Sequence, residues 1–387
     1  MAVHDRIKDL HGEMTEWRRD LHAHPETAFE EHRTSAFVAE KLKTFGIEVH
    51  GGIGRTGLVG VLKGKRKGSG AIGLRADMDA LHIHELTNKP YASKNPGKMH
   101  ACGHDGHTTM LLGAAKYLAE TRDFAGTAYF IFQPAEENEG GGKAMVEDGL
   151  FDKFPISAVY GMHNWPGAPV GEIGLKVGPM MAAADTFEII LTGHGAHGAM
   201  PHQGNDPVVI AAQIVTGLQS IVSRNVDPIE AGVVTVTQIH GGDTWNVIPA
   251  EVVMRGTTRS FKPDIQALIK KNLERVAKGI AAAHGASAEV RYNYGYPPTV
   301  NSEAETHHAA RIAAGVVGEG MVKPDVAPVM GAEDFSFMLE KRPGSYVWLG
   351  AGEDEPNLHS PHFDFNDRIL PIGASYWARL VEETLRG

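Results

Sequence analysis

Apolar side chains recur at helical spacing close to the start of the chain. From Ile7 to Leu21 every third or fourth residue is apolar, which predicts an amphipathic helix, and Pro25 lies just beyond its end. Further along, predicted strands alternate with predicted helices. The strands are expected at 57–62, 71–75, 127–132, 157–161 and 345–349, and the helices at about 33–45, 107–120, 142–148, 304–317 and 371–385. This alternation is typical of a mostly parallel α/β sheet with helices on both faces.

The order of elements changes in the middle of the chain. Strands are predicted at 185–191, 232–239, 251–260 and 286–292, with helices at about 206–223 and 263–284. The order strand–helix–strand–strand–helix–strand is that of a ferredoxin-like α+β unit. We therefore expect a large catalytic domain from residues 1–182 and 296–387, with residues 183–295 inserted as a smaller domain. Helices or sheet edges of such a unit often pair across a two-fold axis, so we expect a lid and dimerisation domain.

Composition narrows the class of protein. A chain of 387 residues, 42% of them hydrophobic, is long enough for two domains with their own cores. The formal net charge is −10 and no basic block occurs, which argues against a nucleic-acid partner. The single Cys excludes an intramolecular disulfide, and the charged N-terminus is unlike a signal peptide. With no long apolar run either, we expect a cytoplasmic protein without a membrane partner.

The chain contains 21 His, and six of them lie within four short polar clusters at the ends of predicted elements. The clusters are Met99–His107, Gln133–Glu137, Gly161–Asn164 and Leu358–His362. In an open parallel sheet, the loops at the carboxyl ends of the strands converge on one crevice, where ligands bind. The four clusters are therefore expected to meet, although they are far apart in the sequence.

The residue types in these clusters suit a divalent metal. Cys, His and carboxylate side chains are the usual ligands of zinc and similar ions. Cys102 and His104 are separated by one Gly, so both can face one centre, and the start of a helix favours the thiolate. In the pair Glu136–Glu137, one carboxylate can ligate metal while its neighbour acts as a general base on water.

Each cluster taken alone has a simpler interpretation. A single His-rich loop is most often a solvated surface, and a Glu–Glu pair is most often the solvated start of a helix. A lone Cys is most often a small buried hydrophobic residue. The joint occurrence of four clusters with a complete ligand set favours a metal site.

Six motifs extend this interpretation to a known family. They lie at 99–107, 132–137, 162–166, 195–202, 246–249 and 331–335. Together they resemble the hippurate hydrolase and N-acyl-amino-acid amidohydrolase family, which is related to aminoacylase and carboxypeptidase G. The resemblance covers essentially the whole chain, from Arg19 to the C-terminal helix.

The resemblance implies a centre of two divalent metal ions per subunit, manganese or zinc. The implied metal ligands are Cys102, His104, Glu137, His163 and His359. Cys102 matches the ligand that bridges the two ions. His104 and His163 complete the set of one ion, and Glu137 and His359 complete the set of the other.

The resemblance also implies roles for residues that do not bind metal. Glu136 matches the general base that deprotonates the water and then protonates the leaving amine, and Asp77 matches an acid that orients a ligand. His197 matches a histidine that reaches a neighbouring subunit's active site and polarises the scissile carbonyl. Asn246 and Arg259 match positions that hold the substrate's carboxylate. Without the resemblance, His197 is a solvated loop residue, Asn246 a turn residue and Arg259 a surface strand residue.

The expected activity is hydrolysis of a hippurate-like or N-acetyl amino acid to a carboxylic acid and a free amino acid. Within the same chemistry, the alternatives are a deacetylase of a biosynthetic intermediate and a hydrolase of an auxin-type or toxin conjugate. A thiol hydrolase with Cys102 as nucleophile and a metal-free binding module are the alternatives from other classes. The expected partners are this small-molecule substrate and further copies of the chain, in a homodimer or homotetramer formed through the inserted domain.

One departure from the family pattern concerns substrate preference. The family usually carries Pro at the position of His82, and His84 is also uncommon there. Both residues follow the predicted strand 71–75 and are most simply loop residues. If they line the pocket, they affect which substrate is preferred and leave the chemistry unchanged.

Overall fold

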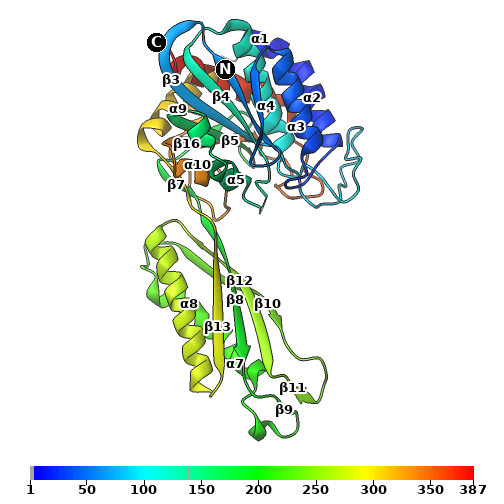
Figure 1. Cartoon of the computed structure of the whole chain (residues 1–387), viewed down its shortest axis with the longest axis vertical. Helices are drawn as coiled ribbons and strands as arrows, with labels where there is room; N and C mark the ends of the chain where they lie inside the picture. The colour runs from blue at the N-terminus through cyan, green and yellow to red at the C-terminus, as the bar shows by residue number, and fades with distance from the viewer. Residues whose placement is uncertain (1–3, 138) are drawn as a thin grey trace. The chain divides into compact units, whose positions relative to one another are not determined.

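The structure, a computed structural model, describes residues 4–137 and 139–387. By its internal contacts the chain divides into two compact units. Unit 1 contains the residues up to 180 together with 300–327 and 334–387, and unit 2 contains 181–299 and 328–333. The chain therefore leaves unit 1 for unit 2 and returns to it, as the element labels in Figure 1 show.

Unit 1 is built on an eight-stranded mixed sheet with the strand order β1-β2-β4-β3-β5-β16-β6-β15. The strands are β1 (Glu48–Ile53), β2 (Gly57–Lys63), β3 (Arg66–Asp77), β4 (Ala125–Gln133), β5 (Ala158–Pro166), β6 (Ile173–Gly174), β15 (Val322–Lys323) and β16 (Gly344–Gly352). The neighbours β4, β3, β5 and β16 are parallel, whereas β1, β2 and β6 pair antiparallel with β2, β4 and β16. The carboxyl ends of the four parallel strands therefore share one edge of the sheet.

Helices cover the sheet of unit 1. They are α1 (Asp5–Asp9), α2 (His11–Ala23), α3 (His32–Thr44), α4 (His104–Thr121), α5 (Gly141–Glu147), α6 (Leu150–Lys153), α9 (Glu303–Val317), α10 (Ser336–Leu339) and α11 (Leu370–Thr384). Helix α4 packs against α2, α3 and α11 and contacts β3, and Figure 1 shows α2, α3 and α4 side by side. The side chains of α4 are buried from its first residue to Ala115, so this helix begins inside the core. The first polar cluster, Met99–His107, lies at the buried start of α4.

Unit 2 has a four-stranded antiparallel sheet with the order β10-β12-β8-β13. The strands are β8 (Ala183–Thr192), β10 (Gly232–His240), β12 (Glu251–Ser260) and β13 (Ser287–Tyr296), and the helices are α7 (Pro207–Asn225) and α8 (Pro263–Ala283). Buried residues alternate with more exposed ones along β8 and β12, as in a sheet with one covered face. The two helices pack on each other and on this sheet, and they enclose a second hydrophobic core.

Short elements complete the chain. Two strand pairs are formed by β9 (Ala196–His197) with β11 (Val247–Ile248), and by β7 (Gly178–Met181) with β14 (Thr299–Asn301). The 3-10 turns cover Pro201–Gln203, Glu319–Met321 and Asp367–Ile369. The chain passes from β7 into unit 2 and returns through β14.

Among the described residues, α7 is the helix with enough length and apolar character to cross a membrane. Its buried residues Ile210, Ile214, Leu218 and Ile221 belong to the core of unit 2. The apolar side of α7 therefore already has a packing partner in the small sheet.

The predicted fold class is confirmed: a large mixed sheet with helices accompanies a smaller unit with the ferredoxin-like element order. Local features differ from the predicted ranges. The strand expected at 71–75 is longer, because Arg66 pairs with Ala125 of β4 and extends the ladder, so that β3 begins at Arg66. Residues 328–333 cluster with unit 2, where Arg259 Nε donates to the Met330 carbonyl at 3.2 Å.

Candidate metal centre

The ends of several elements of unit 1 bring the polar clusters together. Asp77 is the last residue of β3, Gln133 is the last residue of β4, and His163 lies near the end of β5. His104 is the first residue of α4. The carboxyl edge of the parallel strands and the start of one buried helix therefore supply the site, as the arrangement of predicted strands suggested.

A first group of ligand atoms belongs to Cys102, His104 and His163, and these atoms lie within 4.8 Å of one another. Cys102 Sγ is 3.3 Å from His163 Nε2. His104 Nδ1 donates to the Asp79 carbonyl at 2.9 Å, and His163 Nδ1 donates to the Asn164 carbonyl at 2.7 Å. Each ring is therefore oriented by its Nδ1, so its Nε2 is the nitrogen that would bind a metal ion.

A second group shares the same cysteine and consists of Cys102, Glu137 and His359. His359 Nε2 lies 3.1 Å from Glu137 Oε1. His359 adopts a left-handed φ of 63°, and its side chain is half exposed, so this group faces solvent more than the first. The Glu137 amide donates to Asp79 Oδ2 at 2.9 Å, so Asp79 contacts one member of each group.

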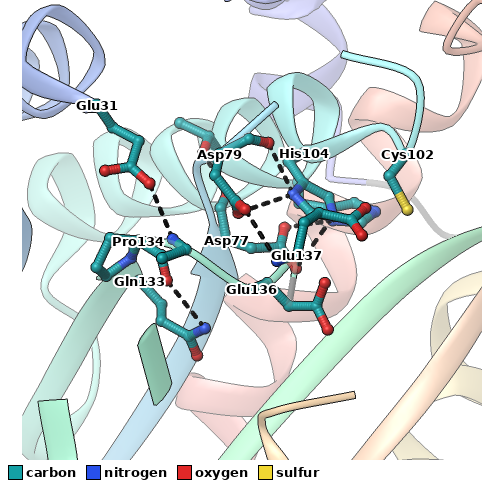
Figure 2. A network of polar contacts seen from close by, with 12 residues as sticks. Glu31, Asp77, Asp79, Cys102, His104, Gln133, Pro134, Glu136 and Glu137 are labelled. Atoms are coloured by element: carbon teal, nitrogen blue, oxygen red, sulfur yellow. Dashed lines mark hydrogen bonds and ion pairs between the residues drawn. The ribbon is translucent and has the colours of Figure 1, made fainter. Parts of the chain in front are cut away.

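Glu136 belongs to neither of these two groups, although its carboxylate lies near His104 and Glu137. The side chain is buried, and Glu136 Oε1 accepts from the Asp334 amide at 3.4 Å. Figure 2 shows the carboxylates of Glu136 and Glu137 leaving the backbone in different directions, with Glu137 on the side of His104 and Cys102. The two adjacent acids can therefore serve different tasks.

Gly103 allows Cys102 and His104 to flank one point. It adopts a left-handed φ of 93°, and a Cβ at this position would lie 2.1 Å from Asn164 Oδ1. A larger residue would therefore clash and also strain the backbone. The single glycine of this spacing is required for close approach between the start of α4 and the end of β5.

The electrostatics of the first group fit a cation. Burial together with the nearby carboxylates of Glu137 and Glu136 holds the pKa of the Cys102 thiol well above its ordinary value. Burial opposes the charge on His104, but the carboxylates of Asp77 and Asp79 outweigh it and raise the pKa of His104 to about 10. His104 Nε2 is also buried without a hydrogen-bond partner in the described part of the chain. This concentration of acidic groups and the unpaired nitrogen are what a divalent cation would satisfy.

His163 differs from His104 in its ionisation. Burial, assisted by the neighbouring imidazole of His107, holds the pKa of His163 well below its ordinary value. The ring is therefore neutral, as a metal ligand must be. The two histidines of this group thus have the same hydrogen-bond orientation but opposite protonation tendencies in the protein without bound ions.

Asp77 lies beside the predicted ligand His104 but forms its hydrogen bonds with other residues. Its Oδ1 accepts from His107 Nδ1 at 2.6 Å, and its Oδ2 accepts from Arg75 at 2.7 Å, whereas its distance to His104 Nε2 is 3.8 Å. Burial opposes the charge, but His104, His107 and Arg75 hold the pKa of Asp77 well below its ordinary value. Asp79 hydrogen-bonds the predicted ligand His104 through its carbonyl and its carboxylate.

The predicted residues of unit 2 are not all brought together within one chain. His197 and Asn246 lie close to each other, because β9 pairs with β11 and the Gly198 amide donates to the Asn246 carbonyl at 2.7 Å. Asn246 shortly precedes β12, which begins at Glu251. Arg259 lies near the other end of β12, about 26 Å from Glu251 at the rise of a strand. Asn246 and Arg259 of one chain therefore do not form a single carboxylate site.

Asp79, His107 and Glu31 contribute to the site although no motif in the sequence predicts their roles. Asp79 lies in the same short motif as Asp77, and only the structure distinguishes which of them reaches His104. Glu31 is fully buried and accepts from the Ala135 amide at 2.9 Å, directly before Glu136 (Figure 2). No local signal in the sequence links residue 31 to this loop. His82 and His84 are exposed.

Comparisons with known proteins agree with this geometry. Residues 73–383 match peptidase family M20/M25/M40. The chain is 43% identical over 386 residues to a hippurate hydrolase from Campylobacter jejuni, with 100% of both chains covered. It is 41% identical over 384 residues to an N-acetylcysteine deacetylase from Bacillus subtilis, covering 98% of this chain and 99% of that one. A solved dinuclear metal-binding peptidase of the M20 family from Bacillus subtilis has a TM-score of 0.86 and 38% identity, covering 98% of this chain and 99% of that one.

Proposed function

The chain belongs to peptidase family M20/M25/M40, and from this premise we propose that it hydrolyses the amide bond of N-acyl amino acids. The products are a carboxylic acid and a free amino acid. The observation that carries the proposal is the pair of ligand groups that share Cys102, with the carboxylate of Glu136 beside them. The names of the hippurate hydrolase and the deacetylase among its relatives support the same substrate class.

The residues fit two divalent ions. Cys102, His104 and His163 would hold one, and Cys102, Glu137 and His359 would hold the other. When bound, two such ions polarise a scissile carbonyl and lower the pKa of water, which is what amide hydrolysis requires. Manganese and zinc are the proposed ions, and the thiolate favours the softer zinc.

Glu136 is the proposed general base. Its carboxylate takes a proton from the attacking water as the water oxygen bonds to the scissile carbon. It then gives that proton to the amide nitrogen as the carbon–nitrogen bond breaks, so the amine leaves in neutral form. Its position beside the ligand Glu137, but outside both ligand groups, leaves it available for this transfer.

The proposed carboxylate site of the substrate is assembled from two subunits. Arg259 has the planar guanidinium that binds a carboxylate with two hydrogen bonds. Asn246 and His197 lie at the other end of the small sheet from Arg259. We therefore assign the second contact to the substrate carboxylate to the partner subunit's Asn246, and polarisation of the scissile carbonyl to the partner subunit's His197. Unit 2 is then both a lid and a dimerisation domain.

The thiol-hydrolase alternative is weaker on physical grounds. A nucleophilic cysteine is activated by a lowered pKa, whereas burial and acidic neighbours raise the pKa of the Cys102 thiol. Glu136 and Glu137 would also have no function in that reaction.

The test is an assay of the full-length protein, reconstituted with manganese or zinc, on a panel of hippurate, N-acetyl amino acids and an auxin-type conjugate. We expect turnover of at least one of the first two classes and its loss after exhaustive chelation. Activity that survives chelation, with no metal detected in the protein, would exclude the metallohydrolase. The rank order of the panel separates the deacetylase from the hippurate-like enzyme.

A further inference from the structure

We propose that Glu31 is a positioning residue that fixes the loop carrying Glu136 and Glu137. The proposal rests on the proposed function for its catalytic consequence, but its structural part can be tested separately. Glu31 lies at the start of α3, more than a hundred residues before this loop, and its side chain is fully buried. In Figure 2 its carboxylate approaches the backbone between Pro134 and Glu136.

Both oxygens of the Glu31 carboxylate accept hydrogen bonds. Its Oε1 accepts from the Ala135 amide at 2.9 Å and from the Phe29 amide at 3.0 Å, and its Oε2 accepts from the Thr56 hydroxyl at 2.5 Å. All these partners donate to the carboxyl oxygens. Burial raises the pKa of the Glu31 carboxyl above its ordinary value, and the hydrogen bonds from Thr56 and the Ala135 amide oppose that rise.

The residue that Glu31 holds is in a strained conformation. Ala135 has a φ of 51°, in the left-handed region that alanine rarely adopts. Phe29 (φ 60°) has the same kind of backbone, and so has Arg55 (φ 71°), the residue before Thr56. Strained backbone persists only where neighbouring contacts determine it, and here Glu31 contacts two of the three strained residues through their amides.

The rest of the loop depends on the turn at Ala135. The Ala135 carbonyl accepts from the Gly141 amide at 2.9 Å, and the Glu137 amide donates to Asp79. Glu136 lies between these two fixed points. If Ala135 relaxed to an ordinary φ, the direction of the chain would change immediately before both acids. Glu31 therefore acts through Ala135 and does not itself touch substrate.

The principal variant is Glu31→Ala, studied in the full chain. We expect faster hydrogen exchange in the peptide that contains Ala135, weaker zinc binding through Glu137 by about 10-fold or more, and a kcat lower by about 10–100-fold with KM little changed. Glu31→Gln keeps one carbonyl oxygen for the two amides, so it should restore most of the activity.

Glu26→Ala is the matched control. The Glu26 carboxylate accepts from the amides of Arg33 and Thr34 at 3.0 and 2.8 Å, so it also anchors the start of α3 but has no contact with the 133–137 loop through these bonds. We expect a similar loss of thermal stability without the change in exchange at Ala135. If Glu31→Ala fails to fold, Thr56→Val removes only the hydroxyl donor. It should change hydrogen exchange at Ala135, zinc affinity and kcat in the same directions, by smaller amounts.

The outcomes separate the two proposals. Equal exchange at Ala135, equal zinc affinity and equal kcat in Glu31→Ala and Glu26→Ala would reduce Glu31 to a structural residue and overturn the inference. A wild-type protein that hydrolyses nothing in the panel would overturn the proposed function. In that case, faster exchange and weaker zinc binding in Glu31→Ala would still support the role of Glu31 in positioning the loop.

Discussion

Hydrogen-bond partners distinguish the ionisation of two neighbouring buried histidines in unit 1, His22 and His100. His22 donates from Nδ1 to Asp105 at 2.9 Å and from Nε2 to Glu85 at 3.2 Å, so both nitrogens carry protons. Burial opposes this charge, but the two carboxylates raise the pKa of His22 to about 9. His100 has no hydrogen-bond partner for either nitrogen in the described residues, and burial lowers its pKa to about 4. Neighbouring rings therefore differ in charge because only one of them has acidic partners.

This difference predicts a pH-dependent stability contribution from His22. A pKa raised from 6.5 to about 9 means that the charged ring stabilises the fold fully below pH 6.5 and progressively less as the pH rises through 9. The free energy of unfolding should therefore fall in His22→Gln by up to about 3 kcal/mol at pH 6, and by much less at pH 9.5. Urea unfolding of the wild-type and His22→Gln proteins at pH 6 and pH 9.5 measures this difference in the free energy of unfolding.

The exposed His32→Gln serves as the control for that comparison. It should change the unfolding free energy little at either pH. An equal loss in His22→Gln at pH 6 and pH 9.5 would show that His22 contributes by packing alone.

Glu136 gives the sharpest prediction at the scale of one residue. Glu136→Gln preserves the shape of the side chain but cannot accept the proton, so turnover should fall by several orders of magnitude, about 10³-fold or more. Metal content should remain at the wild-type level, because Glu136 belongs to neither shared-cysteine group. Metal analysis and steady-state kinetics on the same preparation measure both.

The exposed Glu139, in the same loop, provides a matched substitution. Glu139→Gln should leave both metal content and turnover unchanged. Near-normal activity in Glu136→Gln would mean that another group is the base.

At the scale of elements, the close contact between the start of α4 and β5 depends on one glycine, Gly103. Gly103→Ala places a Cβ 2.1 Å from Asn164 Oδ1 at a left-handed φ, so we expect a loss of about 2 kcal/mol or more and weaker metal binding. Thermal unfolding and zinc titration measure these effects. Gly315→Ala, in the exposed part of α9 with no atom within 4 Å of the new Cβ, should instead stabilise the protein by about 0.5–1 kcal/mol. A Gly103→Ala protein as stable as wild type would refute the close-approach argument.

The elements were predictable where the local pattern is strong. Helical spacing located α2, α4, α7 and α8 to within a few residues, and alternation located the strands of unit 2. β1 was missed, because its residues 48–53 are mostly polar or glycine and lie at the exposed edge of the sheet. The extension of β3 was missed for the same reason, since its first five residues are exposed.

The site was predictable as a set of residue types, but not as a set of contacts. Short motifs with chemical meaning identified Cys102, His104 and Glu137, and the structure places their ligand atoms in shared groups. The supports of these residues were not predictable, because Glu31 and Asp79 act through backbone amides and carbonyls that leave no trace in the local sequence. Whether a side chain reaches a partner across the fold depends on tertiary packing.

At the scale of the whole molecule, the position of His197 predicts a subunit-mixing effect. His197 is exposed on the β9–β11 ribbon of unit 2, distant along β12 from Arg259. If the partner's His197 completes each active site, Glu136→Gln and His197→Ala proteins are each nearly inactive, but refolded mixtures regain about a quarter of wild-type activity. Assays of mixed and unmixed samples, with sedimentation to establish the dimer, measure it.

The control for mixing is the same pair incubated without refolding, where subunits have not exchanged. A monomeric protein with full activity, or mixtures no more active than their components, would contradict a shared site.

The place of β16 in the sheet has a consequence for biosynthesis. This strand, formed by residues 344–352, lies between β5 and β6 in the large sheet, and His359 follows it closely. Unit 2, in contrast, consists almost entirely of one continuous stretch whose first and last long strands, β8 and β13, are paired. On the ribosome, unit 2 therefore has its full set of strands while the large sheet still lacks an inner strand. A chain that ends before residue 344 lacks His359 and should bind zinc at most through the Cys102, His104 and His163 group, so occupancy of both ion positions marks a chain translated past His359.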